Sequence, residues 1–244
     1  MTTILVTRPE PDLGKSTIRL RALNLDAVTY PLMRRVTLAP QLPAAAGFGG
    51  IAISSANALR SLDELGAVPA YRNLPVFTVG DGSAEEARYL GFADVRSASG
   101  AFADLVSLIA AARLRAPVFY PSGTRLSGDL EAALATHDVA VETVPVYEMR
   151  DVAEMPQAML DEIETGRIDA GLFYSRRTAE IFVGLAAGGI GAGGKENFAA
   201  LCISAKAAQP LAAAGFKRVL VAEHPDEEAM MHLTLAFARA QNAS

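Results

Sequence analysis

Six short segments carry hydroxyl, amide or basic side chains and lie between an apolar run and a helix-like pattern. They span residues 7–9, 54–57, 80–83, 121–124, 175–178 and 204–206. A helix that begins at such a point offers free backbone N–H groups and the positive end of its dipole, which suit carboxylates or phosphates. Ordinary N-capping explains any one segment. Six together, with charges such as Arg8 and Lys206, favour an anion-binding cleft.

Tyr147 is a further candidate because it follows an apolar run in the segment Thr-Val-Pro-Val-Tyr-Glu. A phenol with a pKa near ~10 is a neutral hydrogen-bond donor at pH 7, and it can assist a departing hydroxyl group. The alternative is a tyrosine that packs between domains with its hydroxyl in water. The residues alone favour this second interpretation.

Other chemistries lack the residues they need. Cys202, the one cysteine, can form neither an intrachain disulfide nor a thiolate zinc cluster, and its apolar neighbours indicate a small buried side chain. His137, His224 and His232 show no ligand spacing, so no metal site is predicted. The glycine-rich run at 189–194 follows a helix-like segment, and we interpret it as a flexible loop and not as a dinucleotide fingerprint.

Ten short apolar runs predict the strands that would position these residues. The runs span residues 4–7, 27–30, 51–54, 76–79, 94–96, 118–120, 141–144, 170–174, 201–203 and 218–221. Short apolar strands bounded by Gly, Pro or Ser are typical of a parallel sheet that is buried on both faces. Because helix-length segments separate most of them, the sequence predicts a doubly wound α/β fold.

The chain of 244 residues also repeats itself. The segment Val-Gly-Asp-Gly-Ser-Ala at 79–84 resembles Ile-Ser-Ala-Lys-Ala-Ala at 203–208, and Gly91 and Gly215 begin Gly-Phe pairs at the same offset of 124 residues. The duplication predicts two domains with five strands each, the flavodoxin-like number. Linker-like stretches near 31–48 and 145–156 indicate that the chain leaves its first domain, builds the other and returns.

The composition limits the partners. Hydrophobic residues make up 51% of the chain, and the formal charge of −5 argues against a nucleic-acid-coating protein. An acidic small molecule is disfavoured only weakly, because net charge is not pocket charge. The uncharged stretch between Arg35 and Arg60 contains two prolines and three glycines, so we expect no membrane span. The first residues lack a secretory signal pattern, and we expect a cytoplasmic protein.

Seven short motifs occur in order over nearly the whole chain. They are Leu-Val-Thr-Arg-Pro at 5–9, Tyr-Pro-Leu at 30–32, Ser-Ser-Ala-Asn-Ala-Leu at 54–59, Val-Gly-Asp-Gly-Ser-Ala at 79–84, Pro-Val-Tyr-Glu at 145–148, Phe-Tyr-Ser at 173–175 and Ala-Ala-Gly-Phe at 213–216. Through their order and spacing the chain resembles the uroporphyrinogen-III synthases.

The resemblance implies two flavodoxin-like domains, each a five-stranded parallel sheet with flanking helices, joined by a two-stranded linker with the active site in the cleft between them. Domain 1 would then comprise residues 1–34 and 152–244, and domain 2 residues 36–148. The implied reaction cyclises the linear tetrapyrrole hydroxymethylbilane to uroporphyrinogen III, with loss of water and inversion of ring D through a spiro intermediate. It requires no metal and no organic cofactor.

The resemblance also implies roles for individual residues. Tyr147 would assist the loss of water. The family pattern places Arg8, Ser55, Ser83 and Ser175 around the substrate's acetate and propionate groups. Further proposed contacts at the strand ends are Asn57, Gly123, Arg125 and Lys206. The chain departs from the family pattern at Ala207 and Ala208, which argues against a side-chain contact there, and Arg125 replaces a basic residue that the family often carries further on.

Two other functions remain as alternatives. One is a non-catalytic, hinge-type binding protein or sensor for an anionic small molecule. The other is a two-domain nucleotide-sugar transferase, against which the lack of a nucleotide fingerprint argues. For the synthase we expect a monomer, with transient hand-over of substrate from hydroxymethylbilane synthase.

Overall fold

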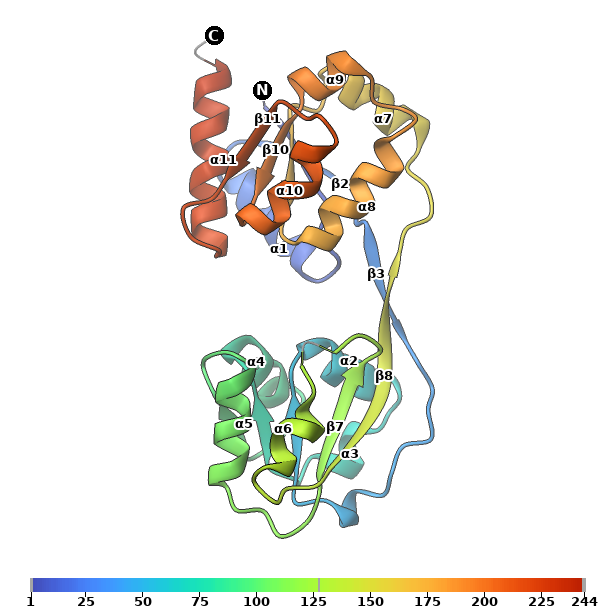
Figure 1. Ribbon diagram of the computed structural model, residues 1–244, viewed down its shortest axis with the longest axis vertical. Helices are drawn as coiled ribbons and strands as arrows, with labels where there is room; N and C mark the ends of the chain where they lie inside the picture. Colours follow the sequence, from blue (N-terminus) through green and yellow to red (C-terminus); the bar gives the residue numbers. More distant parts are fainter. Residues whose placement is uncertain (1, 127, 243–244) are drawn as a thin grey trace. The chain divides into compact units, whose positions relative to one another are not determined.

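The computed structural model describes residues 2–126 and 128–242. Its internal contacts divide the chain into two compact units. Unit 1 comprises residues 1–34 and 150–244, and unit 2 comprises residues 35–149. Strands β3 (Met33–Thr37) and β8 (Val141–Asp151) run through the two boundaries (Figure 1).

Unit 1 is built on a five-stranded sheet in the order β11-β10-β9-β1-β2, in which every pair of neighbours is parallel. Its strands are β1 (Thr3–Val6), β2 (Asp26–Thr29), β9 (Ala170–Phe173), β10 (Ala199–Cys202) and β11 (Arg218–Val221). Its helices are α1 (Asp12–Ala22), α7 (Gln157–Glu164), α8 (Arg176–Ala186), α9 (Ala192–Asn197), α10 (Ala205–Ala213) and α11 (Glu227–Asn242).

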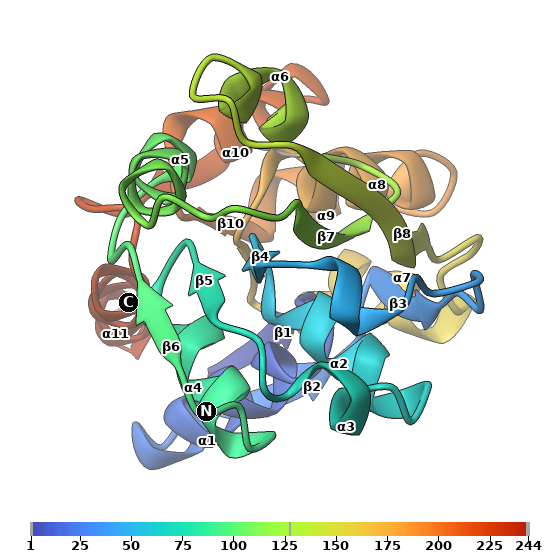
Figure 2. The same cartoon turned by 90° about the horizontal axis from the view of Figure 1, so that it is seen from below.

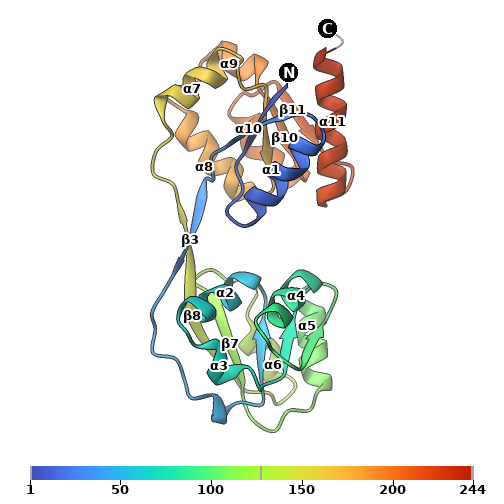
Figure 3. The ribbon, with the colours of Figure 1, turned by 180° about the vertical axis from the view of Figure 1, so that it is seen from behind.

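Helices cover both faces of this sheet, because successive strand residues point to opposite sides. Ile4 and Leu172 belong to the core under α1 and α11. Figure 3 shows these two helices in front of the sheet. Leu5 and Phe173 belong to the core under α7, α8 and α10. These helices lie on the opposite face of the sheet (Figure 1). Cys202 belongs to this second core, which confirms its predicted burial, and that burial raises the pKa of its thiol to about 12.

Unit 2 is built on a six-stranded sheet in the order β3-β8-β7-β4-β5-β6. Its remaining elements are β4 (Gly50–Ile53), β5 (Val76–Thr78), β6 (Val95–Ser97), β7 (Val118–Gly123), the short 3₁₀ helix η1 (Ala45–Gly47), α2 (Ala56–Glu64), α3 (Val68–Tyr71), α4 (Asp81–Tyr89), α5 (Phe102–Ala111) and α6 (Leu130–Ala135). Helices α2, α3 and α4 pack on one face, and α5 and α6 on the other (Figure 2).

The α/β fold class is confirmed, but the expected number of five strands is wrong for unit 2. The sixth strand is β3, whose sequence Met-Arg-Arg-Val-Thr has no continuous apolar run. It forms an edge of the sheet beside β8, which is itself much longer than the predicted run at 141–144. The missed strand thus arises from pairing along the linker and not from local sequence.

The structure explains the internal repeat. At the offset of 124 residues, helix α4 corresponds to α10 and strand β5 to β10. The first repeat supplies β1 and β2 to unit 1 and β4 to β6 to unit 2, and the second supplies β7 and β8 to unit 2 and β9 to β11 to unit 1. Numbered within the repeat, the five shared strands of both sheets run in the flavodoxin-like order 2-1-3-4-5.

The glycine-rich run at 189–194 is only in part the predicted loop, because its last residues lie in helix α9. The backbone N–H groups of Gly191 and Gly194 donate to Glu164 Oε2 at 2.7 and 3.2 Å. A Cβ atom at Gly194 would lie 2.4 Å from the same oxygen. These amides are therefore occupied by a carboxylate of the protein, which removes the basis for a nucleotide site there.

Candidate functional site

Each sheet has one point where the connections change direction, and ligands of such folds bind outside the carboxyl ends of the strands at this point. In unit 1 it lies between β1 and β9, and in unit 2 between β7 and β4. We refer to these two regions as the carboxyl edge of unit 1 and the carboxyl edge of unit 2. The candidate residues are described for each edge separately.

Tyr147 and Gly123 lie together at the carboxyl edge of unit 2. They pair across β7 and β8, at an irregularity in the register between Ser122 and Gly123. A Cβ atom at Gly123 would lie 2.9 Å from Tyr147 Cζ and 3.0 Å from its hydroxyl oxygen, so only glycine leaves room for the ring. The ring packs partly buried on the core under α2, and its hydroxyl has no hydrogen bond to any residue that the structure describes.

Ser55 and Asn57 begin helix α2 at the same edge. The Ser55 hydroxyl accepts from the backbone N–H of Asn57 at 3.3 Å, which is the capping role that its position predicts. The amide of Asn57 lies 3.9 Å from Met149 Sδ on β8 and accepts from Arg60 at 3.2 Å. Because Arg60 also pairs with Glu86, its charge is already balanced.

Ser83 lies in the first turn of helix α4, which follows β5, the neighbour of β4 in the sheet. The N-cap of this helix is Gly80, which has no side chain to accept from the first amides. The Ser83 N–H donates to the Gly80 carbonyl at 3.2 Å, whereas the N–H groups of Asp81 and Gly82 have no acceptor among the described residues and are open to an external one. Arg125 follows β7, is exposed, and forms no ion pair within the described part of the chain.

Arg8 lies at the carboxyl edge of unit 1 and is enclosed by acidic partners. It donates to Asp12 at 2.8 Å, to Ser16 at 3.2 Å and to Glu227 at the start of α11. Its guanidinium carbon lies 4.0 Å from the centre of the Tyr174 ring. Burial and the nearby Glu227 raise the pKa of Tyr174 to about 12. The charge of Arg8 is thus offset by two carboxylates, a feature that its sequence position does not reveal.

Ser175 and Lys206 occupy helix N-termini at the edge of unit 1. The Ser175 hydroxyl caps α8, accepting from the Thr178 N–H at 3.1 Å, and lies 2.7 Å from the Thr178 hydroxyl. Lys206 is exposed in the first turn of α10 and, among the described residues, has no ion-pair partner. Two other cations of this edge are paired, Arg176 with Glu180 and Arg177 with Asp151.

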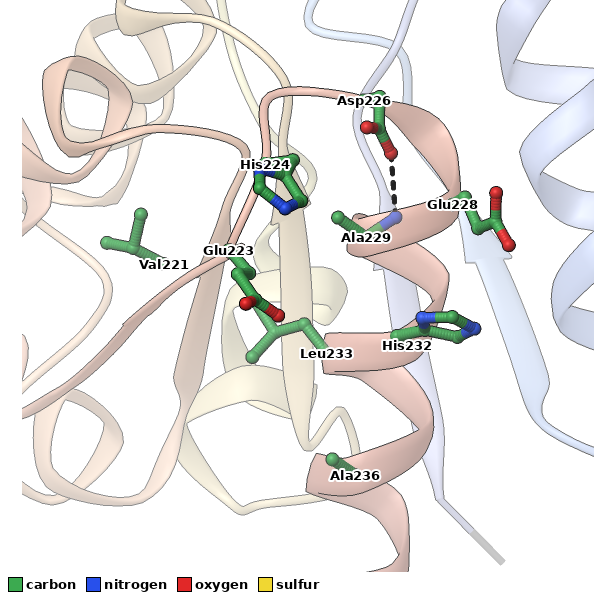
Figure 4. A pocket seen from close by; sticks show the side chains of 9 residues that line it. All are labelled: Val221, Glu223, His224, Asp226, Glu228, Ala229, His232, Leu233 and Ala236. Carbon is green, nitrogen blue, oxygen red and sulfur yellow. Dashed lines mark hydrogen bonds between the residues drawn. The ribbon is translucent and has the colours of Figure 1, made fainter.

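Two hollows of unit 1 differ in charge. One of about 260 Å³ is lined by Arg8, Asp12, Lys15, Arg19 and Glu227, three cations and two carboxylates. A larger hollow of about 460 Å³ lies between the end of β11 and helix α11, where Glu223, Asp226 and Glu228 surround it together with two histidines (Figure 4). Its acidic lining would repel a polycarboxylate, so the hollow at Arg8 suits an acidic ligand better.

The sequence did not reveal one polar pair at the edge of unit 2. The hydroxyls of Ser54 and Tyr120 lie 2.7 Å apart, although Ser54 follows β4 and Tyr120 lies within β7. In the described part of the chain no group of three or more His, Cys, Asp or Glu side chains could hold a metal ion. No helix there is both long enough and apolar enough to span a membrane.

Comparisons with known proteins give one family. A family model described as uroporphyrinogen-III synthase HemD matches residues 16–232. A search among curated proteins gives no match. The crystal structure of uroporphyrinogen-III synthetase from Helicobacter pylori 26695 aligns with a TM-score of 0.68 and 18% identity, over 97% of this chain and all of that one. A mutant uroporphyrinogen III synthase from the extremely thermophilic bacterium Thermus thermophilus aligns with a TM-score of 0.53 and 14% identity over both full chains.

Proposed function

Because the chain belongs to the uroporphyrinogen-III synthase family, we propose that its two carboxyl edges bind hydroxymethylbilane and direct its closure to uroporphyrinogen III. Family membership makes the chain a cyclising lyase of tetrapyrrole biosynthesis, a route that leads to haem, sirohaem and cobalamin. The match over residues 16–232 is the observation that carries this function, and the site geometry supports the roles proposed below.

The reaction sets three tasks for the protein. The hydroxyl on the end of ring A leaves as water, and an electron-poor azafulvene remains. The substituted end carbon of ring D attacks it to give a spiro intermediate, after which ring D detaches, turns over and recloses. Since the pyrroles supply the electrons, the protein must hold the bilane, favour attack at the hindered carbon and ease the loss of water.

We assign the third task to Tyr147. Its hydroxyl has no hydrogen bond to any described residue, so it is available to donate to the hydroxyl that leaves ring A. A phenol hydroxyl can give this assistance without a second acid. Gly123 acts as its positioning residue, because any larger side chain would displace the ring.

We assign the substrate's acetate and propionate groups to the helix N-termini of both edges. The backbone amides of Asp81 and Gly82, which precede Ser83 in α4, and the start of α10 at Lys206 supply donors, and the exposed Arg125 supplies charge. Ser55 accepts from its own helix and keeps its hydroxyl hydrogen to donate to a carboxylate. Ser175 also accepts from its own helix, and its hydrogen is available to a carboxylate when the Thr178 hydroxyl is the donor of the bond between them.

Two further contacts complete the proposed binding groups. Asn57 offers its side-chain amide beside Ser55 at the edge of unit 2. Arg8 helps to bind a carboxylate of the substrate at the edge of unit 1. Because Asp12 and Glu227 offset its own charge, Lys15 and Arg19 supply the further positive charge that this contact needs.

The first test is catalytic turnover. Adding the purified protein should speed the consumption of hydroxymethylbilane in proportion to its concentration, measured against a protein-free control. Binding of the bilane without faster consumption would contradict the proposal and fit a non-catalytic binding protein instead.

Replacing Gly123 by Ala should lower kcat about 10–100-fold, because the new Cβ atom forces the Tyr147 ring away from its position. Initial rates measured over a range of hydroxymethylbilane concentrations give kcat for the variant. Gly184→Ala is the matched control, since nothing lies within 4 Å of the added Cβ there, and its kcat should not change. A Gly123→Ala enzyme with the wild-type kcat would show that Tyr147 needs no such room.

We also propose that the enzyme acts as a monomer in the cytoplasm and receives hydroxymethylbilane from hydroxymethylbilane synthase by transient hand-over. The substrate is an unstable linear molecule that closes spontaneously, so a short transfer would limit its loss. Light scattering should give a mass near 25.6 kDa, and a mass of twice that value would contradict the monomer.

A further inference from the structure

We propose that Tyr120 is a positioning residue that turns the hydroxyl hydrogen of Ser54 toward a carboxylate of the bound substrate. The inference rests on the proposed function, because that function supplies a ligand with a carboxylate on every ring. It adds a binding group, Ser54, and a residue that acts through it.

The two side chains meet where ligands of this fold bind. Ser54 directly follows β4, Tyr120 lies in the neighbouring strand β7, and the connections of the sheet change direction between these two strands. Tyr120 is 1% exposed and packs in the core under α5 and α6, whereas Ser54 is only partly buried. The pair therefore joins a fixed interior group to a group that a ligand can reach.

The direction of the hydrogen bond follows from counting hydrogens. The two hydroxyls share one hydrogen bond of 2.7 Å, and within the described residues neither has another partner. If Ser54 donated, the phenol hydrogen of Tyr120 would be buried without an acceptor, which is costly. Tyr120 therefore donates to Ser54 Oγ, and the hydrogen of Ser54 is left to point away from the core.

Burial also keeps Tyr120 a donor, because removal from water raises the pKa of its phenol above the usual value. The hydrogen bond from Tyr120 fixes the orientation of the Ser54 hydroxyl. This hydroxyl has therefore lost its rotational freedom before the ligand arrives. A carboxylate oxygen is the acceptor that such a donor binds best, since hydrogen bonds to charged groups are the stronger ones.

Ser122 provides a contrast on the same face of β7. It lies two residues beyond Tyr120, it is 1% exposed, and its hydroxyl has no hydrogen-bond partner among the described residues. A group so deeply buried cannot meet the substrate. Ser122→Ala therefore removes a hydroxyl from the same edge without removing a binding group, which makes it a local control.

A double-mutant cycle tests whether Tyr120 acts through Ser54. Tyr120→Phe should raise KM for hydroxymethylbilane about fivefold, and Ser54→Ala about tenfold, with kcat within about twofold of wild type. The double variant should match Ser54→Ala, because Tyr120 has nothing left to orient. A KM raised about fiftyfold, the product of the two single effects, would show independent roles and overturn the proposal.

Three controls separate positioning from general damage. Ser54→Thr keeps a hydroxyl and should hold KM within about twofold of wild type. Tyr71→Phe also removes a buried phenol hydroxyl, which donates to the Pro43 carbonyl, and it should lower the melting temperature without changing KM. Ser122→Ala should leave KM unchanged. A rise in KM for Tyr71→Phe equal to that for Tyr120→Phe would overturn the proposal.

The same experiments separate this proposal from the proposed function. If the wild-type protein forms no uroporphyrinogen III, the function itself fails, and the role of Tyr120 fails with it. If the wild type forms that product while Tyr120→Phe keeps the wild-type KM, only the inference about Tyr120 is wrong.

Discussion

Replacing Tyr147 by Phe should lower kcat for hydroxymethylbilane about 100-fold while the protein stays folded. The phenol is the proton donor proposed for the departing hydroxyl, and positioned acids typically contribute factors of about 10²–10⁴. Phenylalanine keeps the ring that packs on the core of unit 2 and removes only the hydroxyl, which bonds to no described residue. The melting temperature should therefore stay within about 2 °C of wild type. Rapid assays are needed, because spontaneous closure competes with the slow variant.

Tyr89→Phe is the matched control for this change. Tyr89 ends helix α4, is 86% exposed, and belongs to the same unit, so its loss should not alter kcat. If Tyr147→Phe turned over at the wild-type rate, Tyr147 would have only a packing role, which is the interpretation that the sequence pattern alone favours. The loss of water would then need no side-chain acid.

Replacing Phe182 by Ala should lower the free energy of unfolding of unit 1 by about 3–5 kcal/mol. Phe182 is fully buried on α8, and its ring lies 5.0 Å from that of Phe173, 5.5 Å from Phe198 and 5.8 Å from Phe216. Truncation to Ala opens a cavity at the centre of this cluster and removes its aromatic contacts. Urea unfolding followed by far-UV circular dichroism measures the change.

Ile18→Ala on α1 is the control, because Ile18 is 69% exposed and its truncation should change the free energy of unfolding by less than about 0.5 kcal/mol. The cores of the two units share no residue, so Phe182→Ala should lower the free energy of unfolding of unit 1 and not that of unit 2. A loss below about 1 kcal/mol would show that the aromatic cluster relaxes to fill the cavity.

The elements that the sequence predicted are those whose cause is local. Strands β9 and β10 are four-residue apolar runs that are buried on both faces. Such a run predicts a strand even when the strand that pairs with it is unknown. The pattern of apolar runs missed strand β3, because its charged sequence becomes a strand only beside β8. Helix α9 was missed because its glycines are poor helix formers, and the contact between their amides and Glu164 lies 27–30 residues away.

The residues of the candidate site also divide into those whose role follows from the local sequence and those whose role depends on distant partners. The capping roles of Ser55 and Ser175 follow from their place at the start of a helix, and the structure contains both caps. Of the two carboxylates that pair with Arg8, Asp12 lies four residues away, but Glu227 lies 219 residues away, and no sequence pattern near Arg8 predicts this second partner. The contact between Gly123 and the Tyr147 ring depends on a register shift in β7, and no residue pattern predicts that shift. The substrate contacts themselves stay predictions.

The most direct test of the whole account is the isomer composition of the product. Spontaneous closure of hydroxymethylbilane gives uroporphyrinogen I, whereas closure with inversion of ring D gives uroporphyrinogen III. The purified protein should yield the type III isomer almost alone when its rate greatly exceeds the spontaneous one. The product is oxidised to the porphyrin and separated by chromatography beside a protein-free control. A mixture with the isomer ratio of that control would contradict the assignment of this chain's chemistry.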